Sequence, residues 1–453
     1  SLARRSTVAS LWSGSQLFAT YPMRLVSNLV TTRFLAPDAF GLIATVGVAH
    51  TLIELLLDVG IRSAIIRSER GDDPRFLGTA FTFQLIRGGL VAVILVTLAA
   101  LIESHAADMV PSGSVYADPR LPDLLYASVL VILFRSFRSP GLHAAARRLD
   151  MRSRAICEVA GVVVNVVVAI VLTVALESVW ALLIGMISGA AVVTVVSHAI
   201  IPGPPVMPAW DRDDAREIWS FGKWLMPASL GTGLGNQSDR LVFGLFLDAT
   251  TFGLYAVARV WGDMVQTVQG RFVDALLLPV LSTARRRGGA GDMGRAAAKL
   301  MLASGLVSGA LVGGVVVFAI WIFPEIYVAP FDTVAYLVIA IALRVVFAPL
   351  RTLGQAVLAA GQSAHFAVVT SVGNLAMLAV IAALMAFWTF DAALLAFVLV
   401  PVPIAMGMLS HPSAAGVLPA RALVAATVGM AAAVVPAVLW AVGAFETMSP
   451  GAG

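Results

Sequence analysis

The sequence predicts an all-α polytopic membrane protein made of two six-helix bundles that are related by an internal repeat. Three observations support this fold class: the composition, the spacing of long apolar runs, and a helical hairpin motif that occurs twice. Of the 453 residues, 59% are hydrophobic and 12% are charged, with a mean hydropathy of +0.91. A soluble domain has about twice that charged fraction, so most of the apolar surface is expected to face lipid.

The apolar runs set the predicted helix count. A helix needs about 20 apolar residues to cross a bilayer. By this measure the chain has thirteen predicted spans: 6–34, 39–60, 77–102, 122–146, 155–175, 178–201, 218–246, 251–283, 299–323, 333–357, 364–388, 391–410 and 419–445. The thirteenth span predicts at least one extra C-terminal helix beyond the two bundles.

Proline and charge mark the predicted boundary between the bundles. The segment 202–217 is rich in both and separates the sixth predicted span from the seventh. We therefore expect four parts: an N-terminal six-helix lobe at 1–201, a cytoplasmic linker at 202–217, a C-terminal six-helix lobe at 218–411, and an additional transmembrane helix at 412–453.

A short hairpin motif follows the first predicted span and returns after the seventh. Residues 33–42 (RFLAPDAFGL) align without a gap with residues 245–254 (LFLDATTFGL). Pro37 cannot continue a helix, so the first span is predicted to end there. Gly41 lets two backbones pass closely as the second span begins. A repeat at this period indicates a duplicated bundle, and internal repeats are common in secondary transporters.

Basic residues gather in every second loop through the first nine predicted spans. These loops contain Arg4 and Arg5; Arg62, Arg67, Arg70 and Arg75; Arg147, Arg148, Arg152 and Arg154; Arg212 and Arg216; and Arg285, Arg286, Arg287, Arg295 and Lys299. The positive-inside rule places these loops, and with them the N-terminus, in the cytoplasm. The last of these groups, at 285–299, is consistent either with a segment that lies on the anionic inner leaflet or with a solvated loop.

Ionisable groups inside the predicted spans are the most informative residues. Five arginines lie near the middle of their spans: Arg24, Arg87, Arg135, Arg259 and Arg344. A central arginine that faces lipid costs about 2.5–3.5 kcal/mol on insertion scales, so these groups are expected to be paired or hydrated. Glu54 and Asp263 are the acidic groups nearest to them in depth, and Asp263 shares a helix face with Arg259, four residues earlier.

This central group has more positive than negative charge. Excess guanidinium groups in a hydrated cavity suit an anionic substrate, and arginine binds phosphate with bidentate geometry. For any single arginine, a structural pair between helices is an equal alternative. Tyr21 and Trp261 lie at similar depth and are candidates to stack on sugar rings, although such residues more often pack or anchor at the membrane interface.

Other kinds of chemistry have no support in the sequence. No His/Glu cluster has metal-ligand spacing, no glycine-rich phosphate loop follows a strand, and no nucleophile–base set is visible. Cys157 is the single cysteine, so no internal disulfide is possible. We expect neither an enzyme nor a nucleic-acid partner. We expect no cofactor apart from a coupling cation, Na⁺ or H⁺, for which Glu54 and Asp263 are the candidate ligands.

Several motifs, taken in order, resemble the polysaccharide transporter branch of the multidrug/oligosaccharidyl-lipid/polysaccharide exporter superfamily, the Wzx-type oligosaccharide flippases. The motifs are RFLxPxxFG at 33–41, LDVG at 57–60, DRLVxGxFL at 239–247, FGLY at 252–255 and LPVLS at 278–282. The resemblance covers the first twelve predicted spans.

The resemblance implies two six-helix lobes in a V shape around a central cavity. It also implies transport of an undecaprenyl-diphosphate-linked oligosaccharide from the inner to the outer leaflet of a bacterial cytoplasmic membrane, for O-antigen, exopolysaccharide or lipopolysaccharide synthesis. Membrane lipids are further expected partners, and a polysaccharide polymerase or export machinery is a candidate partner. Family members use cavity arginines on the first, second and eighth helices. Arg24 and Arg259 match the first and eighth, whereas the second helix has Glu54 and His50 instead.

Two other functions stay open at this point. A multidrug or cation antiporter of the same superfamily would require a net acidic cavity, whereas the central charges here are net basic. A membrane glycan polymerase or ligase would require a large external loop with catalytic groups, and the longest predicted one is the modest segment 103–123. A scaffold without transport activity is a third alternative, against which intramembrane arginines argue only weakly.

Overall fold

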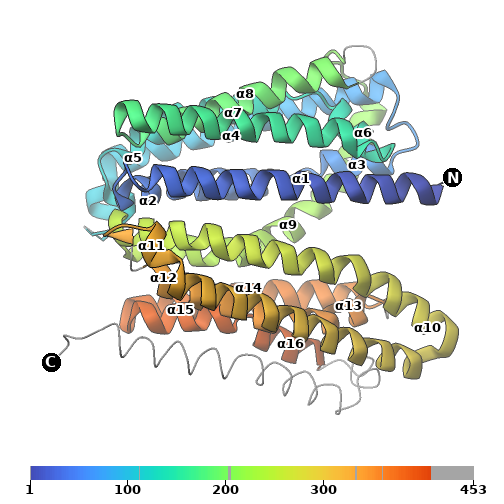
Figure 1. The fold of residues 1–453 in the computed structure, drawn as a ribbon. Helices are drawn as coiled ribbons and strands as arrows, with labels where there is room; N and C mark the ends of the chain where they lie inside the picture. The colour runs from blue at the N-terminus through green and yellow to red at the C-terminus, as the bar shows by residue number, and fades with distance from the viewer. Residues whose placement is uncertain (1, 112, 202–205, 332–333, 360, 410–453) are drawn as a thin grey trace. The chain divides into compact units, whose positions relative to one another are not determined.

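A computed structural model of the chain describes residues 2–111, 113–201, 206–331, 334–359 and 361–409 (Figure 1). Within these ranges every regular element is a helix, which confirms the predicted all-α fold. The thirteenth predicted span, and with it the additional helix at 412–453, lies outside the described residues. The chain divides into two compact units, which are described separately below.

Unit 1 consists of residues 1–233 and 243–253. Its helices are α1 (Leu2–Thr31), α2 (Pro37–Leu56), α3 (Ile61–Arg67), α4 (Pro74–Met109), η1 (Val115–Ala117), α5 (Leu121–Ser136), α6 (Gly141–Arg147), α7 (Met151–Leu176), α8 (Trp180–Ile200) and most of α9 (Arg212–Phe246). Helix α7 packs along both α8 and α1, and α4 packs along α5 (Figure 1). The predicted span 122–146 is split into α5 and α6, because Pro140 lies between them and cannot donate a backbone hydrogen bond.

Unit 2 consists of residues 234–242 and 254–453. Its helices are most of α10 (Ala249–Trp321), α11 (Phe323–Ile326), α12 (Val334–Leu343), η3 (Arg344–Leu350), α13 (Arg351–Ala359), α14 (Ser363–Phe387), α15 (Phe390–Leu399) and α16 (Pro401–Leu409). The stretch α12–η3–α13 covers the predicted span 333–357. Pro349 lies in its 3-10 segment, where the missing N–H interrupts regular α-helical bonding.

Helix α10 is a helical hairpin rather than one straight rod. The indole of Trp261 lies 5.1 Å from the ring of Phe318, although a straight helix at 1.5 Å per residue would place these residues about 85 Å apart. The Gln269 amide donates to Ser304 Oγ at 3.0 Å in the same antiparallel contact. The predicted spans 251–283 and 299–323 therefore lie side by side (Figure 1).

The connection between these two halves of α10 continues the helix. Residues 284–298 lie outside the predicted spans, yet their backbone is helical throughout. The chain reverses direction between Gln269 and Ser304, the inner of the two contacts just described.

In the described part of the chain, eight helical stretches are long and apolar enough to cross a membrane. The other four predicted spans within this part lie on α1, α5, α9 and the first half of α10, and they too are helical. Helix α5 has only 16 residues, and α9 and α10 carry several charged groups. The protein is a multi-pass membrane protein.

The two copies of the hairpin motif meet at equivalent residues within unit 1. In the repeat alignment, Pro37 corresponds to Ala249 and Gly41 to Gly253. A Cβ atom on Gly41 would lie 2.2 Å from the carbonyl oxygen of Ala249, and one on Gly253 would lie 1.7 Å from the carbonyl oxygen of Pro37. The contact is reciprocal, as in an interface with two-fold symmetry. This reciprocity supports the predicted internal repeat.

Pro37 itself has a different local role from the predicted one. Helix α1 already ends at Thr31, and Pro37 begins α2. A proline suits the first position of a helix because its missing N–H would have no intrahelical partner there.

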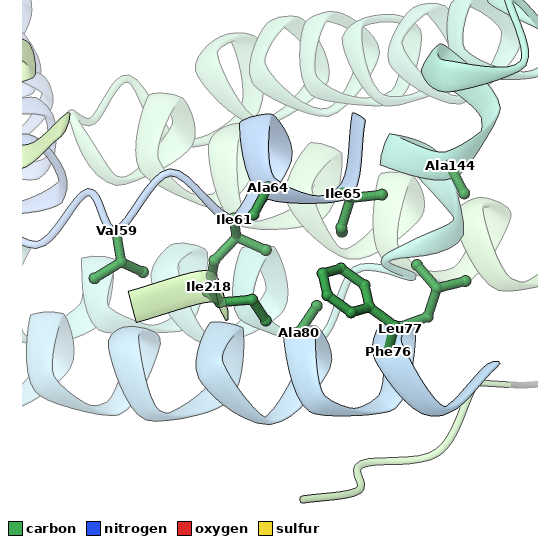
Figure 2. Close-up of a cluster of buried hydrophobic side chains, with 9 residues drawn as sticks. All are labelled: Val59, Ile61, Ala64, Ile65, Phe76, Leu77, Ala80, Ala144 and Ile218. Atoms are coloured by element: carbon green, nitrogen blue, oxygen red, sulfur yellow. The ribbon is translucent and has the colours of Figure 1, made fainter. Parts of the chain in front are cut away.

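The segment that follows residue 205 is anchored on unit 1. The backbone N–H of Ala209 donates to the Gly78 carbonyl at 3.2 Å, and Trp210 stacks on Phe83 with 5.4 Å between ring centroids. Ile218 of α9 is fully buried in an apolar cluster with residues of α3, α4 and α6 (Figure 2). The described part of the predicted linker is therefore packed on α4.

Ionic contacts secure the start of α9 in the same place. Arg70 pairs with Asp214 at 2.5 Å and with Glu217 at 2.8 Å. The Asp211 carboxylate caps α9 by accepting backbone hydrogen bonds from Asp213 at 2.9 Å and Asp214 at 3.0 Å. These two bonds lower the pKa of Asp211 below its ordinary value, whereas burial raises the pKa of Asp214.

This cap predicts a specific pH dependence of stability. Because the folded-state pKa of Asp211 is lowered, its stabilising effect is fully present above the unfolded pKa of about 3.9 and is lost as the pH falls below it. We expect the thermal midpoint of the wild type to fall more between pH 6 and pH 3.5 than that of Asp211→Ala. The burial that raises the pKa of Asp214 is common to both proteins, whereas the smaller contribution of the Asp211 charge to that shift is lost in the variant. Equal pH slopes for the two proteins, measured in detergent, would contradict the assignment.

Candidate functional site

Unit 1 contains a polar cavity of about 260 Å³ among helices α2 to α7. Five arginines line it, from five different segments: Arg62, Arg87, Arg135, Arg138 and Arg154. Three carboxylates line it as well, those of Glu54, Asp58 and Glu158. With His143, the remaining ionisable lining group, counted as neutral, the cavity has an excess of two positive charges.

The carboxylates in this cavity neutralise only some of the arginines. Glu54 Oε1 lies 3.1 Å from Arg135 Nη1, and Glu158 Oε1 lies 3.8 Å from Arg138 Nη1. Arg87 donates from Nη2 to the backbone carbonyl of Glu54 at 2.8 Å. In the part of the chain that the structure describes, Arg62, Arg87 and Arg154 form no ion pair.

Two of the guanidinium groups also have unused donors. The Nε atoms of Arg87 and Arg138 are buried and have no hydrogen-bond acceptor among the described residues. A buried donor without an acceptor costs about 1–3 kcal/mol. These two Nε–H groups therefore have hydrogen-bonding capacity that no described residue uses.

The end of α5 explains how this cavity is built. Gln84 of α4 donates from Nε2 to the carbonyls of Ser136 at 2.8 Å and Arg138 at 2.9 Å, and so satisfies carbonyls that a helix end leaves free. A Cβ atom on Gly88 would lie 1.7 Å from Ser136 Oγ, so glycine allows α4 and α5 to approach closely here. Arg135 in the last turn of α5 also complements the negative end of the helix dipole.

Unit 2 contains a second charged cluster, which is buried. Arg259 is only 3% exposed, and its Nε donates to Asp239 Oδ2 at 2.9 Å while Nη1 donates to Asp263. Asp239 also accepts from the Tyr255 hydroxyl, and Asp263 accepts from Arg240 Nη2 at 2.7 Å. Arg259 is thus held between two carboxylates, and the predicted pair with Asp263 is formed.

One aromatic ring completes this cluster. The guanidinium of Arg344 lies 4.2 Å from the centroid of the Phe397 ring, and that of Arg259 lies 5.3 Å from the same ring. Such cation–π contacts are favourable at this range. Within the described residues Arg344 has no ion pair, and Asp239 Oδ1 has no hydrogen-bond donor.

With both sites described, comparison with known proteins identifies the family. A profile of the polysaccharide biosynthesis protein family matches residues 30–301, more than half of the chain. The chain belongs to this family of polysaccharide biosynthesis proteins. The predicted polysaccharide branch is thereby confirmed. No curated protein matches the sequence.

Solved structures show which fold this polysaccharide biosynthesis protein has. It is similar to the lipid II flippase MurJ in an inward closed conformation, with a TM-score of 0.72 and 11% identity over 95% of this chain and 92% of that chain. It is also similar to a MATE family multidrug resistance transporter of the MOP superfamily in its inward-facing conformation, with a TM-score of 0.63 and 14% identity over 92% and 95% of the two chains. A MOP superfamily transporter from Pyrococcus furiosus is similar as well, with a TM-score of 0.51 and 15% identity over 95% of each chain.

The predicted site residues of this polysaccharide biosynthesis protein fall mainly into the two clusters. Glu54, Arg87 and Arg135 line the cavity of unit 1. Arg259, Asp263 and Arg344 lie together in unit 2.

Three predicted residues lie elsewhere. Arg24 on α1 is exposed and forms no ion pair with a described residue, and Tyr21 lies half-buried on the same helix. Trp261 donates to the Tyr327 hydroxyl at 2.9 Å and packs against Phe318 and Phe323. Its ring therefore takes part in an aromatic cluster of unit 2. His50, another ionisable group of the second span, is buried and hydrogen-bonded to Ser128 at 2.9 Å.

Sequence reasoning did not assign Arg62, His143 and Arg154 to the cavity. The two arginines were placed with the cytoplasmic loop residues. Arg62 lies on the short helix α3, which packs on α4, and His143 lies on the short helix α6, which packs on α7; Arg154 lies in the first turn of α7. Among the described residues, no group of three or more His, Cys, Asp or Glu side chains is arranged to hold a metal ion.

Proposed function

We propose that this protein is a flippase that moves a lipid-diphosphate-linked oligosaccharide repeat unit from the inner to the outer leaflet of a bacterial cytoplasmic membrane. It would do so by alternating access, as a step in polysaccharide export. The observation that carries the proposal is the excess of guanidinium groups among the membrane helices of each unit. Unit 1 places five arginines against three carboxylates, and unit 2 holds an unpaired Arg344 beside the Arg259 cluster.

The chemistry of this excess favours an anionic substrate. Charged groups inside a membrane protein are costly unless paired or hydrated, so unpaired arginines are retained for a ligand or a pathway. A diphosphate-linked lipid supplies the matching negative charge, and membership of a polysaccharide biosynthesis family points to a glycan as the attached group. The MurJ neighbour is described as a lipid II flippase, which is consistent with this substrate class.

A second function is favoured by one comparison only. The MATE neighbour is described as a multidrug resistance transporter. Most substrates of a cation antiporter would be repelled by net positive clusters, so we rank this function lower. Glu54 and Asp263 each pair with an arginine, and we propose that they hold the arginines in place. Coupling to Na⁺ or H⁺ stays a prediction.

A deletion strain tests the proposed function. We expect it to lose polymer export and to accumulate complete lipid-linked repeat units on the inner leaflet. Complementation with Arg87→Ala or Arg344→Gln, which each remove one guanidinium group from one of the two clusters, should restore at most a tenth of wild-type export. Arg216→Ala is the control, because this arginine is 82% exposed and pairs only with the equally exposed Asp213.

Other outcomes would reject the proposal in different ways. Continued export of single, unpolymerised repeat units would indicate a polymerase. Normal polymer with increased sensitivity to cationic drugs would indicate an antiporter. Full export by both arginine variants would remove the link between the guanidinium groups and transport.

A further inference from the structure

We propose that the cavity of unit 1 is a diphosphate-binding site, which receives the diphosphate group of a membrane lipid. The inference rests on the proposed function for the identity of the lipid, but the binding chemistry follows from the cavity alone. Its arginine donors come from α3, α4, α5, the connection after α5, and α7, so a bound anion would join five segments of unit 1.

Charge balance selects the ligand. The cavity lining has five arginines and three carboxylates, an excess of two positive charges. A diphosphate that joins a lipid to a sugar has about two negative charges at neutral pH, like a phosphomonoester, and would neutralise this excess. An ordinary phospholipid phosphodiester has half that charge.

The unused donors indicate where the anion would lie. Arg87 Nε and Arg138 Nε are both buried without an acceptor. Arg62 and Arg154 line the same cavity and have no carboxylate partner among the described residues. Phosphate oxygens accept several hydrogen bonds from guanidinium groups in a planar, bidentate arrangement. A diphosphate between these arginines would satisfy the free Nε atoms.

In this structure the Glu54 carboxylate occupies part of the position beside Arg135 where the anion would bind. Its carboxylate pairs with Arg135 at 3.1 Å, and its carbonyl accepts from Arg87. Both members of the ion pair are partly exposed, at 41% for Arg135 and 31% for Glu54. An incoming diphosphate would compete with Glu54 for Arg135, so this carboxylate is expected to weaken anion binding.

The size and place of the cavity favour a lipid headgroup. Its volume of about 260 Å³ is just below the roughly 300 Å³ at which pockets for drug-sized ligands begin. It holds an anionic group, while the glycan and the lipid chain would stay outside. The lining residues Arg62, Arg138 and Arg154 lie at helix ends beside the loops that the positive-inside rule places in the cytoplasm. Lipid-linked precursors present their headgroups on that side under the proposed function.

Binding measurements on the full-length protein in detergent test this site. The probes are inorganic pyrophosphate, inorganic phosphate, farnesyl diphosphate and phosphatidylglycerol, each measured by titration calorimetry. We expect farnesyl diphosphate to bind most tightly, pyrophosphate next, and phosphatidylglycerol at least ten-fold more weakly than farnesyl diphosphate. Arg87→Gln and Arg154→Gln should each weaken diphosphate binding at least ten-fold. Arg216→Gln should leave it unchanged.

The variant Glu54→Gln separates a binding site from a structural cluster. It removes a competing carboxylate and should tighten diphosphate binding several-fold, opposite in sign to the arginine variants. Weaker binding in Glu54→Gln, or equal affinity in all variants, would overturn the proposal. Equal affinity for pyrophosphate and farnesyl diphosphate would overturn the lipid as the source and leave the free anion.

Export assays keep this inference distinct from the proposed function. If Arg87→Gln binds diphosphate normally and yet abolishes export, the binding site is refuted while the flippase proposal survives. If the deletion strain exports polymer and accumulates no lipid-linked units, the flippase proposal is refuted. Diphosphate binding to the cavity would then be judged by the titrations alone.

Discussion

Adding a single methyl group at Gly41 or Gly253 is expected to destabilise the protein by at least about 3 kcal/mol, at or beyond the upper end of typical overpacking costs. The new Cβ would lie 2.2 Å from the Ala249 carbonyl oxygen in Gly41→Ala and 1.7 Å from the Pro37 carbonyl oxygen in Gly253→Ala. Both obstacles are backbone atoms, which cannot rotate away as a side chain does. The thermal midpoint of purified protein in detergent should fall sharply for each variant.

Two comparisons make this prediction specific. Gly47→Ala lies on the same helix, α2, and its Cβ would meet nothing within 4 Å; it should be neutral or stabilising, because alanine favours a helix by about 1 kcal/mol over glycine. The double variant Gly41→Ala/Gly253→Ala should cost less than the sum of the single variants, because both methyl groups separate the same two backbones. Additive costs, or a destabilised Gly47→Ala, would contradict the reciprocal contact.

The second large effect is expected at Arg259. Removing one partner of a buried ion pair costs about 3–5 kcal/mol, because the other charge is left without compensation. Arg259→Ala would leave Asp239, which is 0% exposed, with the Tyr255 hydroxyl as its one hydrogen-bond donor among the described residues. The sequence alone predicts that this variant loses export but still inserts in the membrane. The structure adds that unit 2 should unfold at a lower temperature.

A charge-neutral double variant separates folding from transport. Asp239→Asn/Arg259→Gln keeps hydrogen-bonding groups at both positions without a buried charge, so most of the lost stability should return. If the Arg259 guanidinium contacts the substrate, export should stay low in this double variant. Export restored together with stability would show that Arg259 acts only through the fold. Stability no better than that of Arg259→Ala would show that the two residues are not an energetic pair.

Much of this architecture can be predicted from the sequence. The apolar runs predict twelve helical segments within the described residues, and all twelve are helical. The aligned motifs at 33–42 and 245–254 predict the duplication that the Gly41–Gly253 contact reflects. The pair of Arg259 with Asp263 is readable because residues four apart lie on one face of a helix.

Contacts between helices could not be predicted in the same way. The periodicity of apolar residues shows which residues share a helix face, but it does not show which neighbouring helix that face contacts. Asp239 is twenty residues from Arg259, on another helix, and only packing makes it the second partner. Arg62 and Arg154 have the pattern of loop residues, but Arg62 lies on the short helix α3 and Arg154 in the first turn of α7, and both line the cavity. The bend of α10 likewise depends on where its two halves can bury their apolar faces.

The composition of the chain and the spacing of its apolar and charged residues thus determine its helices, its repeat and its intramembrane charges. Which arginines are neutralised and which stay free for a ligand is decided by side-chain packing between distant segments.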